Sequence, residues 1–228
     1  MGGAKMGSSP VDASERLTAL QRDLLAAFFA LDRDFFLTGG AALVGFWIGH
    51  RHTDDLDLFT LDDEAFARGP HVLAAAAERV GASWAVRQDA PGFRRYVVTR
   101  GEETIVVDLV RERVAQRVAH KPERDGVRVD PPEEILANKL TTLVARQEER
   151  DLVDVYVLET RFGLRVEDAL DAALAKDGGC TPATLAWLLS QIRIPATMRL
   201  PGNVDPTQLA EWLTELVRRL RAAAHPAG

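Results

Sequence analysis

The spacing of apolar residues along this 228-residue chain changes near residue 115. Before that point, short apolar or alternating runs predict strands, and runs with helical spacing predict helices between them. We expect strands at 34–38, 54–60, 83–87, 94–100 and 104–110. We expect helices from Leu17 (capped by Asp12 or Ser14), at 41–48 and at 64–80.

After residue 115 the apolar spacing is that of helices almost throughout. Pro131 and Pro132 separate a polar stretch from the first of them, since proline suits the first turn of a helix. We expect helices at 133–147, 149–160, 166–175, 181–191 and 205–224. The pattern therefore predicts an α/β part followed by an α-helical part.

Composition restricts the class of protein further. The chain is 46% hydrophobic and 27% charged, as in ordinary globular proteins, and its net charge of -6 argues against general attraction to polyanions. The single cysteine, Cys180, excludes an internal disulfide framework and predicts a cytoplasmic protein. No apolar run approaches the roughly 20 residues of a membrane span, so we expect no membrane association. Residues 1–10 are rich in Gly and Ser, which predicts a disordered leader.

The candidate chemistry begins where the first strand runs into Gly39 and Gly40. The next strand carries Asp55 and Asp57 two positions apart, so both side chains should share one face. Carboxylates bind hard divalent cations, and the amides of a glycine turn at a helix start bind phosphate. Either feature alone more often marks a plain turn or a solvated strand end. Their order within one short segment favours a phosphate-plus-metal site.

Three further positions have both a functional and an ordinary interpretation. Asp108 lies within an apolar strand, where it is a third metal ligand or the partner of a nearby arginine, Arg95 or Arg111. Lys139 falls on the apolar face of a predicted helix, as a phosphate ligand or as a lysine at the core edge. Asp151 and Asp154 share a helix face, as site residues or as part of a surface ladder of ion pairs.

With these residues, the chain resembles the AbiEii/AbiGii toxin family of nucleotidyltransferases, in the DNA polymerase β-like superfamily. Five blocks carry the resemblance, in order: 36–43 (FLTGGAAL), 51–58 (RHTDDLDL), 107–109 (VDL), 134–140 (EILANKL) and 150–156 (RDLVDVY). The resemblance implies an α+β fold, in which a mixed sheet flanked by helices is followed by an α-helical C-terminal domain. It implies a catalytic domain at 11–115 and a helical domain at 116–228 that completes the active site.

The resemblance also implies an activity, the transfer of a nucleoside monophosphate from an NTP with Mg²⁺. Asp55, Asp57 and Asp108 would then bind metal, and Lys139 and Asp151 would join them as catalytic residues. Nucleotide contacts would come from residues in four of the blocks: Thr38, Gly39, Gly40, Arg51, Lys139 and Asp154. Such proteins are typically toxins of toxin–antitoxin or phage-defence systems, which implies a cognate antitoxin, and some modify the tRNA 3′ end.

One departure from the superfamily pattern is that Gly40 stands where many members have a serine, so Thr38 or backbone amides would have to replace its hydroxyl. An RNA acceptor would fit the segment 87–128, which has ten basic and seven acidic residues, a net +3. The competing predictions are a small-molecule nucleotidyltransferase of the aminoglycoside type, which needs an acidic pocket, and a catalytically silent nucleotide-binding module.

Overall fold

Five strands form the sheet on which the first half of the molecule is built. The computed structural model describes residues 16–114 and 116–225. The spatial order is β1 (Phe35–Thr38), β2 (Asp55–Thr60), β5 (Glu103–Arg111), β4 (Phe93–Arg100) and β3 (Ser83–Ala90). Only β2 and β5 run parallel; the other neighbours are antiparallel, and β4 turns directly into β5. The mixed sheet and all five predicted strands are confirmed.

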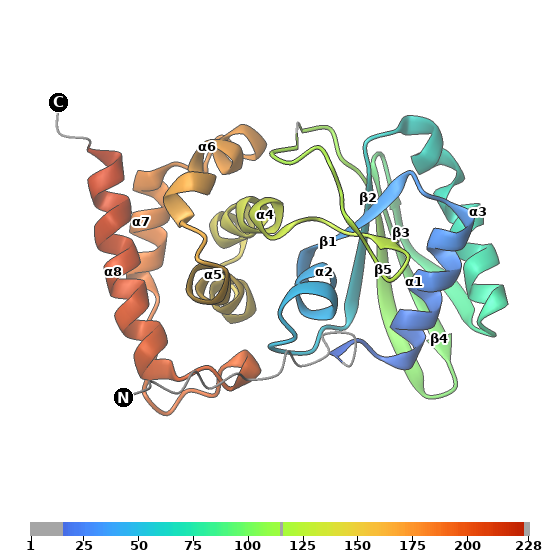
Figure 1. Ribbon diagram of the computed structural model, residues 1–228, viewed down its shortest axis with the longest axis horizontal. Helices are drawn as coiled ribbons and strands as arrows, with labels where there is room; N and C mark the ends of the chain where they lie inside the picture. Colours follow the sequence, from blue (N-terminus) through green and yellow to red (C-terminus); the bar gives the residue numbers. More distant parts are fainter. Residues whose placement is uncertain (1–15, 115, 226–228) are drawn as a thin grey trace, which may run out of the picture.

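Helices cover the sheet on both sides (Figure 1). Helices α1 (Ala19–Leu31) and α3 (Asp63–Arg79) lie against one face, and the short α2 (Gly39–Ala42) with its π-helical continuation η2 (Leu43–Trp47) lies on the other. The start of α1 differs from the prediction. Its N-cap is Thr18, which exchanges hydrogen bonds with Gln21 in a capping box. The predicted caps, like the predicted leader at 1–10, lie outside the described residues.

The second half is helical, as predicted. It contains α4 (Pro132–Ala145), α5 (Glu149–Phe162), α6 (Val166–Lys176), α7 (Pro182–Gln191) and α8 (Pro206–Ala224), with a 3-10 turn, η3 (Pro201–Asn203), before the last. An unpredicted hairpin, β6 (Glu123–Arg124) and β7 (Val127–Arg128), precedes α4. Val129 bridges to Leu37, so this segment lies beside β1, and the helices begin only at Pro132.

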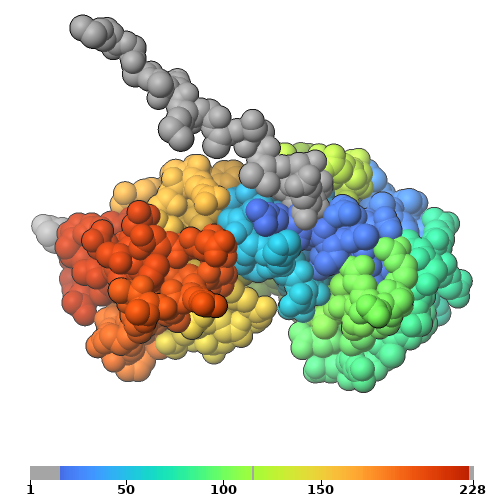
Figure 2. All heavy atoms as spheres, turned by 90° about the horizontal axis from the view of Figure 1, so that it is seen from below, coloured from blue at the N-terminus to red at the C-terminus, as the bar shows by residue number. Residues whose placement is uncertain are grey.

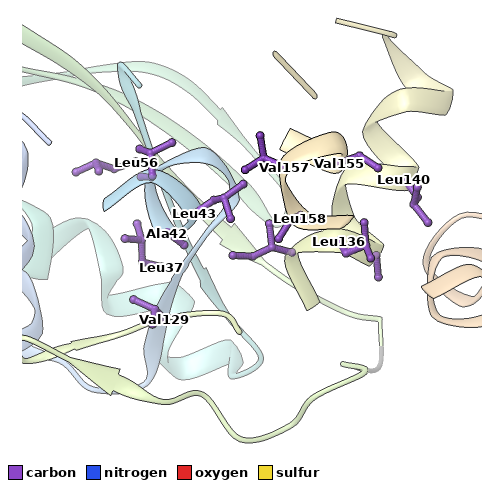
Figure 3. Packing of buried hydrophobic residues seen from close by; sticks show 14 of the residues in the cluster. Leu37, Ala42, Leu43, Leu56, Val129, Leu136, Leu140, Val155, Val157 and Leu158 are labelled. Carbon is purple, nitrogen blue, oxygen red and sulfur yellow. The ribbon is translucent and has the colours of Figure 1, made fainter. Parts of the chain in front are cut away.

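One hydrophobic core joins the two halves. In Figure 3, Leu43 of η2 lies between Leu37 and Leu56 of the sheet and Leu158 of α5, and all four side chains are buried. The helix that follows the glycine turn is therefore packed on both sides, which fixes the turn relative to α4 and α5. Among the described residues, no helix has both the length and the apolar character needed to cross a membrane.

Candidate active site between the sheet and the helical half

The glycine turn at the end of β1 can only be made by glycine at its first position. Gly39 has φ +64°, in the left-handed region, and a Cβ there would overlap the carboxylate of Asp57. Gly40 has ordinary backbone angles, but a Cβ there would lie 2.8 Å from Nη2 of Arg51. The turn thus brings its backbone directly against a carboxylate on one side and a guanidinium on the other.

The strand register aligns four polar residues in one row across the sheet. Thr38 of β1 is opposite Asp57 of β2, Asp57 is opposite Asp108 of β5, and Asp108 is opposite Arg95 of β4. Residues directly opposite each other point to the same face. Asp55 lies two residues before Asp57 and therefore on that face too. The predicted common face for Asp55 and Asp57 is confirmed, and Asp108 shares it.

The position of Asp57 in this row is electrostatically unfavourable for a carboxylate. Burial, followed by the neighbouring charges of Asp108 and Asp55, raises the pKa of Asp57 to about 6, although Lys139 and Arg146 act in the other direction. A carboxylate in such a place is stabilised by a cation. This is the environment expected of a side chain that holds a divalent metal ion.

Asp108 has a different partner. Arg95 donates from Nε and Nη2 to its two carboxylate oxygens, at 2.8 and 2.7 Å. The Asp108 side chain is 7% exposed and that of Arg95 is 46% exposed. The ordinary interpretation of Asp108, an ion pair with a nearby arginine, therefore describes this structure, and the partner is Arg95.

The helical half supplies the cations that face this row. Lys139 of α4 is buried, and its Nζ lies 2.7 Å from Asp151 Oδ1 and 2.7 Å from Asp154 Oδ2 of α5. Arg146, two turns after Lys139, binds Asp151 through Nε at 2.8 Å. Lys139 is thus neither a lysine at the core edge nor a free cation, because two buried carboxylates hold it in place.

Asp154 is the centre of a second set of contacts. Arg51 donates from Nε and Nη2 to its two oxygens, each at 2.8 Å, and His50 Nε2 lies 2.8 Å from Oδ1. Burial alone would raise the pKa of Asp154, but Lys139, Arg51 and His50 hold it well below its usual range. The Arg51 guanidinium also lies close to the glycine turn, since a Cβ at Gly40 would come within 2.8 Å of its Nη2. The charge of Asp154 therefore holds both Lys139 and Arg51 in place.

A cavity of about 730 Å³ lies between these two walls. Figure 2 shows the halves side by side, with a notch between them at one edge of the view. Six cations line the cavity: Arg51, Arg95, Lys139, Arg146, Arg150 and Lys176. Five carboxylates also line it: Asp55, Asp57, Asp108, Glu112 and Asp177. The metal-binding candidates come from the sheet and most of the cations from the helices, so a ligand in the cavity meets opposite charges on its two sides.

The predicted nucleotide contacts fall into two groups. Thr38, Gly39, Gly40, Arg51 and Lys139 line the cavity with Asp55, Asp57 and Asp108. Asp151 and Asp154 are not among the lining residues, since their carboxylates are bound to cations behind the wall. Direct contact of these two aspartates with a nucleotide stays a prediction. The structure shows them as the groups that hold Lys139, Arg51 and Arg146.

The hydroxyl of Thr38 is already engaged. It donates to Asp130, which is buried and also lies 2.7 Å from Lys121. Asn138 donates to the Thr38 oxygen at 3.3 Å. Thr38 therefore has no hydroxyl hydrogen left for a phosphate, and the serine hydroxyl missing at Gly40 is not replaced by this side chain. Backbone amides of the turn are the remaining donors.

Several lining residues were not predicted as site residues. Arg146 could have been found, since a cation seven residues after Lys139 lies on the same face of a helix. Arg150 lies next to Asp151 in a matched block, and its Nη1 is 3.8 Å from Asp55 Oδ2. Lys176 has no such signal, because only the fold brings the end of α6 to the cavity, where Glu134 binds the lysine at 2.8 Å.

The residues present fit a divalent cation in part. Asp55 and Asp57 share one face of the sheet and both line the cavity. Within the described residues, no group of three or more His, Cys, Asp or Glu side chains is placed to hold a metal ion. Asp108 is paired with Arg95 here. Mg²⁺ commonly takes one or two carboxylates and completes its shell with substrate phosphates and water. The three-carboxylate set stays a prediction.

Comparison with solved structures supports the class of fold. A Helicobacter pylori protein solved as a candidate nucleotidyltransferase superposes with a TM-score of 0.60 at 17% identity, covering 96% of this chain and 97% of that one. A second H. pylori protein, JHP933, gives a TM-score of 0.57 at 18% identity and covers 90% and 92%. No curated protein sequence matches the chain. The molecule shares the fold of these two proteins over nearly its whole length.

The family follows from the sequence itself. The family model described as "Nucleotidyl transferase AbiEii toxin, Type IV TA system" matches residues 22–224. This chain belongs to that family and is a nucleotidyltransferase of the toxin type. The resemblance predicted from the five sequence blocks is confirmed, and so is the enzyme class.

Proposed function

We propose that this enzyme transfers a nucleoside monophosphate from an NTP to the 3′ end of tRNA, with Mg²⁺ held by Asp55 and Asp57. One observation carries the proposal. A single cavity has the carboxylates of β2 and β5 on one wall and Lys139, Arg146 and Arg150 on the other. A metal-bound triphosphate has cationic and anionic parts, and this pair of walls complements both.

The protein's own groups have separate tasks in such a transfer. The amides at Gly39 and Gly40 and the ammonium of Lys139 would bind the phosphates. A bound Mg²⁺ would neutralise charge on the reacting phosphates. The acceptor hydroxyl oxygen forms a bond to the α-phosphorus, the bond from that phosphorus to the pyrophosphate oxygen breaks, and a carboxylate of the sheet wall takes the hydroxyl proton. The buried pairs of Asp151 and Asp154 keep the lysine and the arginines in position.

The mixed lining favours an anionic acceptor over a polycationic drug. A pocket for an aminoglycoside should be acidic, whereas this cavity has six cations for five carboxylates. Arg95 and Arg150, which are 46% and 38% exposed, lie where a phosphodiester backbone could reach them. The net charge of +3 on segment 87–128 also favours an anionic acceptor.

The direct test is a transfer assay with each α-labelled NTP, Mg²⁺ and total tRNA, analysed on a denaturing gel. We expect label on tRNA with one preferred nucleotide, and no label with Asp55→Asn/Asp57→Asn or without divalent metal. Cleavage of the labelled RNA from its 3′ end would locate the addition. Label on protein or on an aminoglycoside, with none on RNA, would refute the acceptor; equal labelling by the double variant would refute the site.

A further inference from the structure

Four of the cations that line the cavity differ in how deeply their ion pairs are buried. Lys139 and Arg51 are 6% and 7% exposed and are bound to Asp151 and Asp154, which are fully buried. These pairs cannot separate without leaving a charge in the interior. Arg95 and Arg150, in contrast, are well exposed and approach Asp108 and Asp55, the carboxylates proposed for metal. Arg95 and Arg150 thus stand near carboxylates proposed for metal, although Arg150 makes its shorter contact with Glu148, at 2.6 Å. Arg146, which is also exposed, binds the buried Asp151 instead.

Arg95 is the stronger case of the two. Both arms of its guanidinium fork are hydrogen-bonded to Asp108, whereas Arg150 Nη1 is 3.8 Å from Asp55, beyond hydrogen-bond length. The fork takes one lone pair on each Asp108 oxygen, so a metal ion at this carboxylate would lie close to a positive charge. The neighbour of Asp108 in the row is Asp57, directly opposite in the parallel register of β2 and β5. The guanidinium therefore compensates the charge of Asp108 beside a second carboxylate proposed for metal.

While it holds Asp108, the Arg95 guanidinium also lies over an aromatic ring. Its guanidinium carbon lies 5.4 Å from the centre of the Phe93 ring, on the same strand and the same face, and Arg95 lines the cavity. A phosphate oxygen pair matches the guanidinium fork as well as a carboxylate does. Asp108, being 7% exposed, cannot stay charged alone, so its release requires another cation.

On the proposed function, we infer that Arg95 is an exchangeable counter-ion of Asp108: it holds this carboxylate in the metal-free protein and moves to a phosphate group of the substrate when Asp108 takes a divalent cation. Arg95 then binds the polyanionic substrate and Asp108 binds the metal ion, and each of these two contacts requires the other. The phosphate can belong to the nucleotide or to the acceptor RNA.

The inference is tested by Mn²⁺ binding to the whole protein, followed by electron paramagnetic resonance and without any reaction. With Mn²⁺ alone, we expect Arg95→Gln to bind the ion about tenfold more tightly than the wild type, because one positive charge beside the site is gone. Arg95→Lys, which keeps the charge but lacks the fork, should fall between them. Equal or weaker binding by Arg95→Gln, at an unchanged melting temperature, would overturn the inference.

Two additions identify the source of the phosphate. A non-hydrolysable NTP analogue, or a single-stranded RNA with a blocked 3′ end, is added to the wild type and to Arg95→Gln. We expect one of them to remove the difference in Mn²⁺ affinity, and the one that does so supplies the phosphate that Arg95 binds. If neither reduces the difference, Arg95 does not exchange and the inference is wrong.

Two variants separate this inference from the proposed function. Arg100 lies on the same strand but on the opposite face, where it pairs with Asp23 at 2.7 Å, so Arg100→Gln removes a comparable ion pair and should bind Mn²⁺ like the wild type. If Arg100→Gln also binds more tightly, net charge alone explains the effect and the inference fails. Asp55→Asn/Asp57→Asn should lose Mn²⁺ binding; if it does not, the metal site of the proposed function is wrong whatever Arg95 does.

Discussion

At the scale of single residues, the site combines carboxylates that lack positive charge with carboxylates that are saturated with it. Asp57 belongs to the first kind, since burial and Asp108 raise its pKa, and Asp154 to the second, since three cationic or polar partners lower its pKa. Removing the charge should therefore have different effects at the two positions. At Asp57 it should abolish transfer, and at Asp154 it should lower the free energy of unfolding.

Replacing Asp57 by Asn should therefore stabilise the metal-free protein while abolishing transfer. At pH 7.5 in the presence of EDTA, we expect the free energy of unfolding to rise by about 1–2 kcal/mol, because a crowded carboxylate becomes neutral. Urea denaturation measures this change. Asp55→Asn is the matched control: the Asp55 side chain is 36% exposed, so its variant should lose transfer with little change in stability. A destabilised Asp57→Asn would contradict the electrostatic account.

Replacing Asp154 by Asn should destabilise the protein by about 3–5 kcal/mol at neutral pH, because Lys139 and Arg51 lose a buried counter-ion. The pH dependence has a definite sign. A carboxyl with a lowered folded pKa stabilises above its unfolded pKa, about 4, and this contribution is lost as the pH falls through the folded value. Urea midpoints between pH 7 and 3 should therefore fall less steeply for the variant than for the wild type. Asp171→Asn, on an exposed position of α6, should match the wild type throughout.

At the scale of elements, apolar spacing and turn residues sufficed to predict the strands and helices, because each has a strong local pattern. The hairpin of β6 and β7 was missed, since two-residue strands have no periodicity and are stabilised by pairing beside β1. The N-cap of α1 differs from the predicted Asp12 or Ser14, because Thr18 and Gln21 have the spacing of a capping box and form one. The roles of the aspartates near the cavity could not be predicted. Nothing in the sequence distinguishes an aspartate that faces a cavity from one that faces a buried lysine, and Asp151 is of the second kind.

The conformation of the glycine turn predicts the effect of adding a side chain at Gly39. Gly39→Ala should lower transfer by more than 100-fold, on the order of 3 kcal/mol, because its Cβ would displace the Asp57 carboxylate. Gly101→Ala is a close control: Gly101 has nearly the same φ, +62°, but no atom lies within 4 Å of its added Cβ. Both variants should lose similar stability from backbone strain, measured by thermal melting. Equal activity in the two would mean that the turn does not position Asp57.

At the scale of the whole molecule, the sheet and the helices share one hydrophobic core beside the cavity, which includes Leu43 and Leu158. The pair of Arg51 and Asp154 links the loop before β2 to α5. A sequence boundary near residue 115 marks a change of secondary structure, and the domain limits predicted from it stay a prediction. The cavity exists only where the two halves meet.

Unfolding experiments test whether the sheet and the helical half unfold together. The four tryptophans include Trp84 on the sheet and Trp212 on α8, so variants that keep only one of these two, with Phe at the other positions, report each half separately. We expect the fluorescence midpoint in urea to coincide with the circular dichroism midpoint within each variant. Midpoints that differ between probes within one variant would show that the halves unfold independently.

We expect metal and phosphates to meet in this cavity, between Asp55, Asp57 and Lys139. The sharpest test is a crystal structure with Mn²⁺ and a non-hydrolysable NTP analogue, in which the anomalous signal of manganese is measured. The account predicts a manganese peak about 2.1 Å from oxygens of both Asp55 and Asp57, with phosphate oxygens within hydrogen-bond distance of Lys139 Nζ. A manganese peak away from β2, or a triphosphate bound outside the cavity, would contradict it.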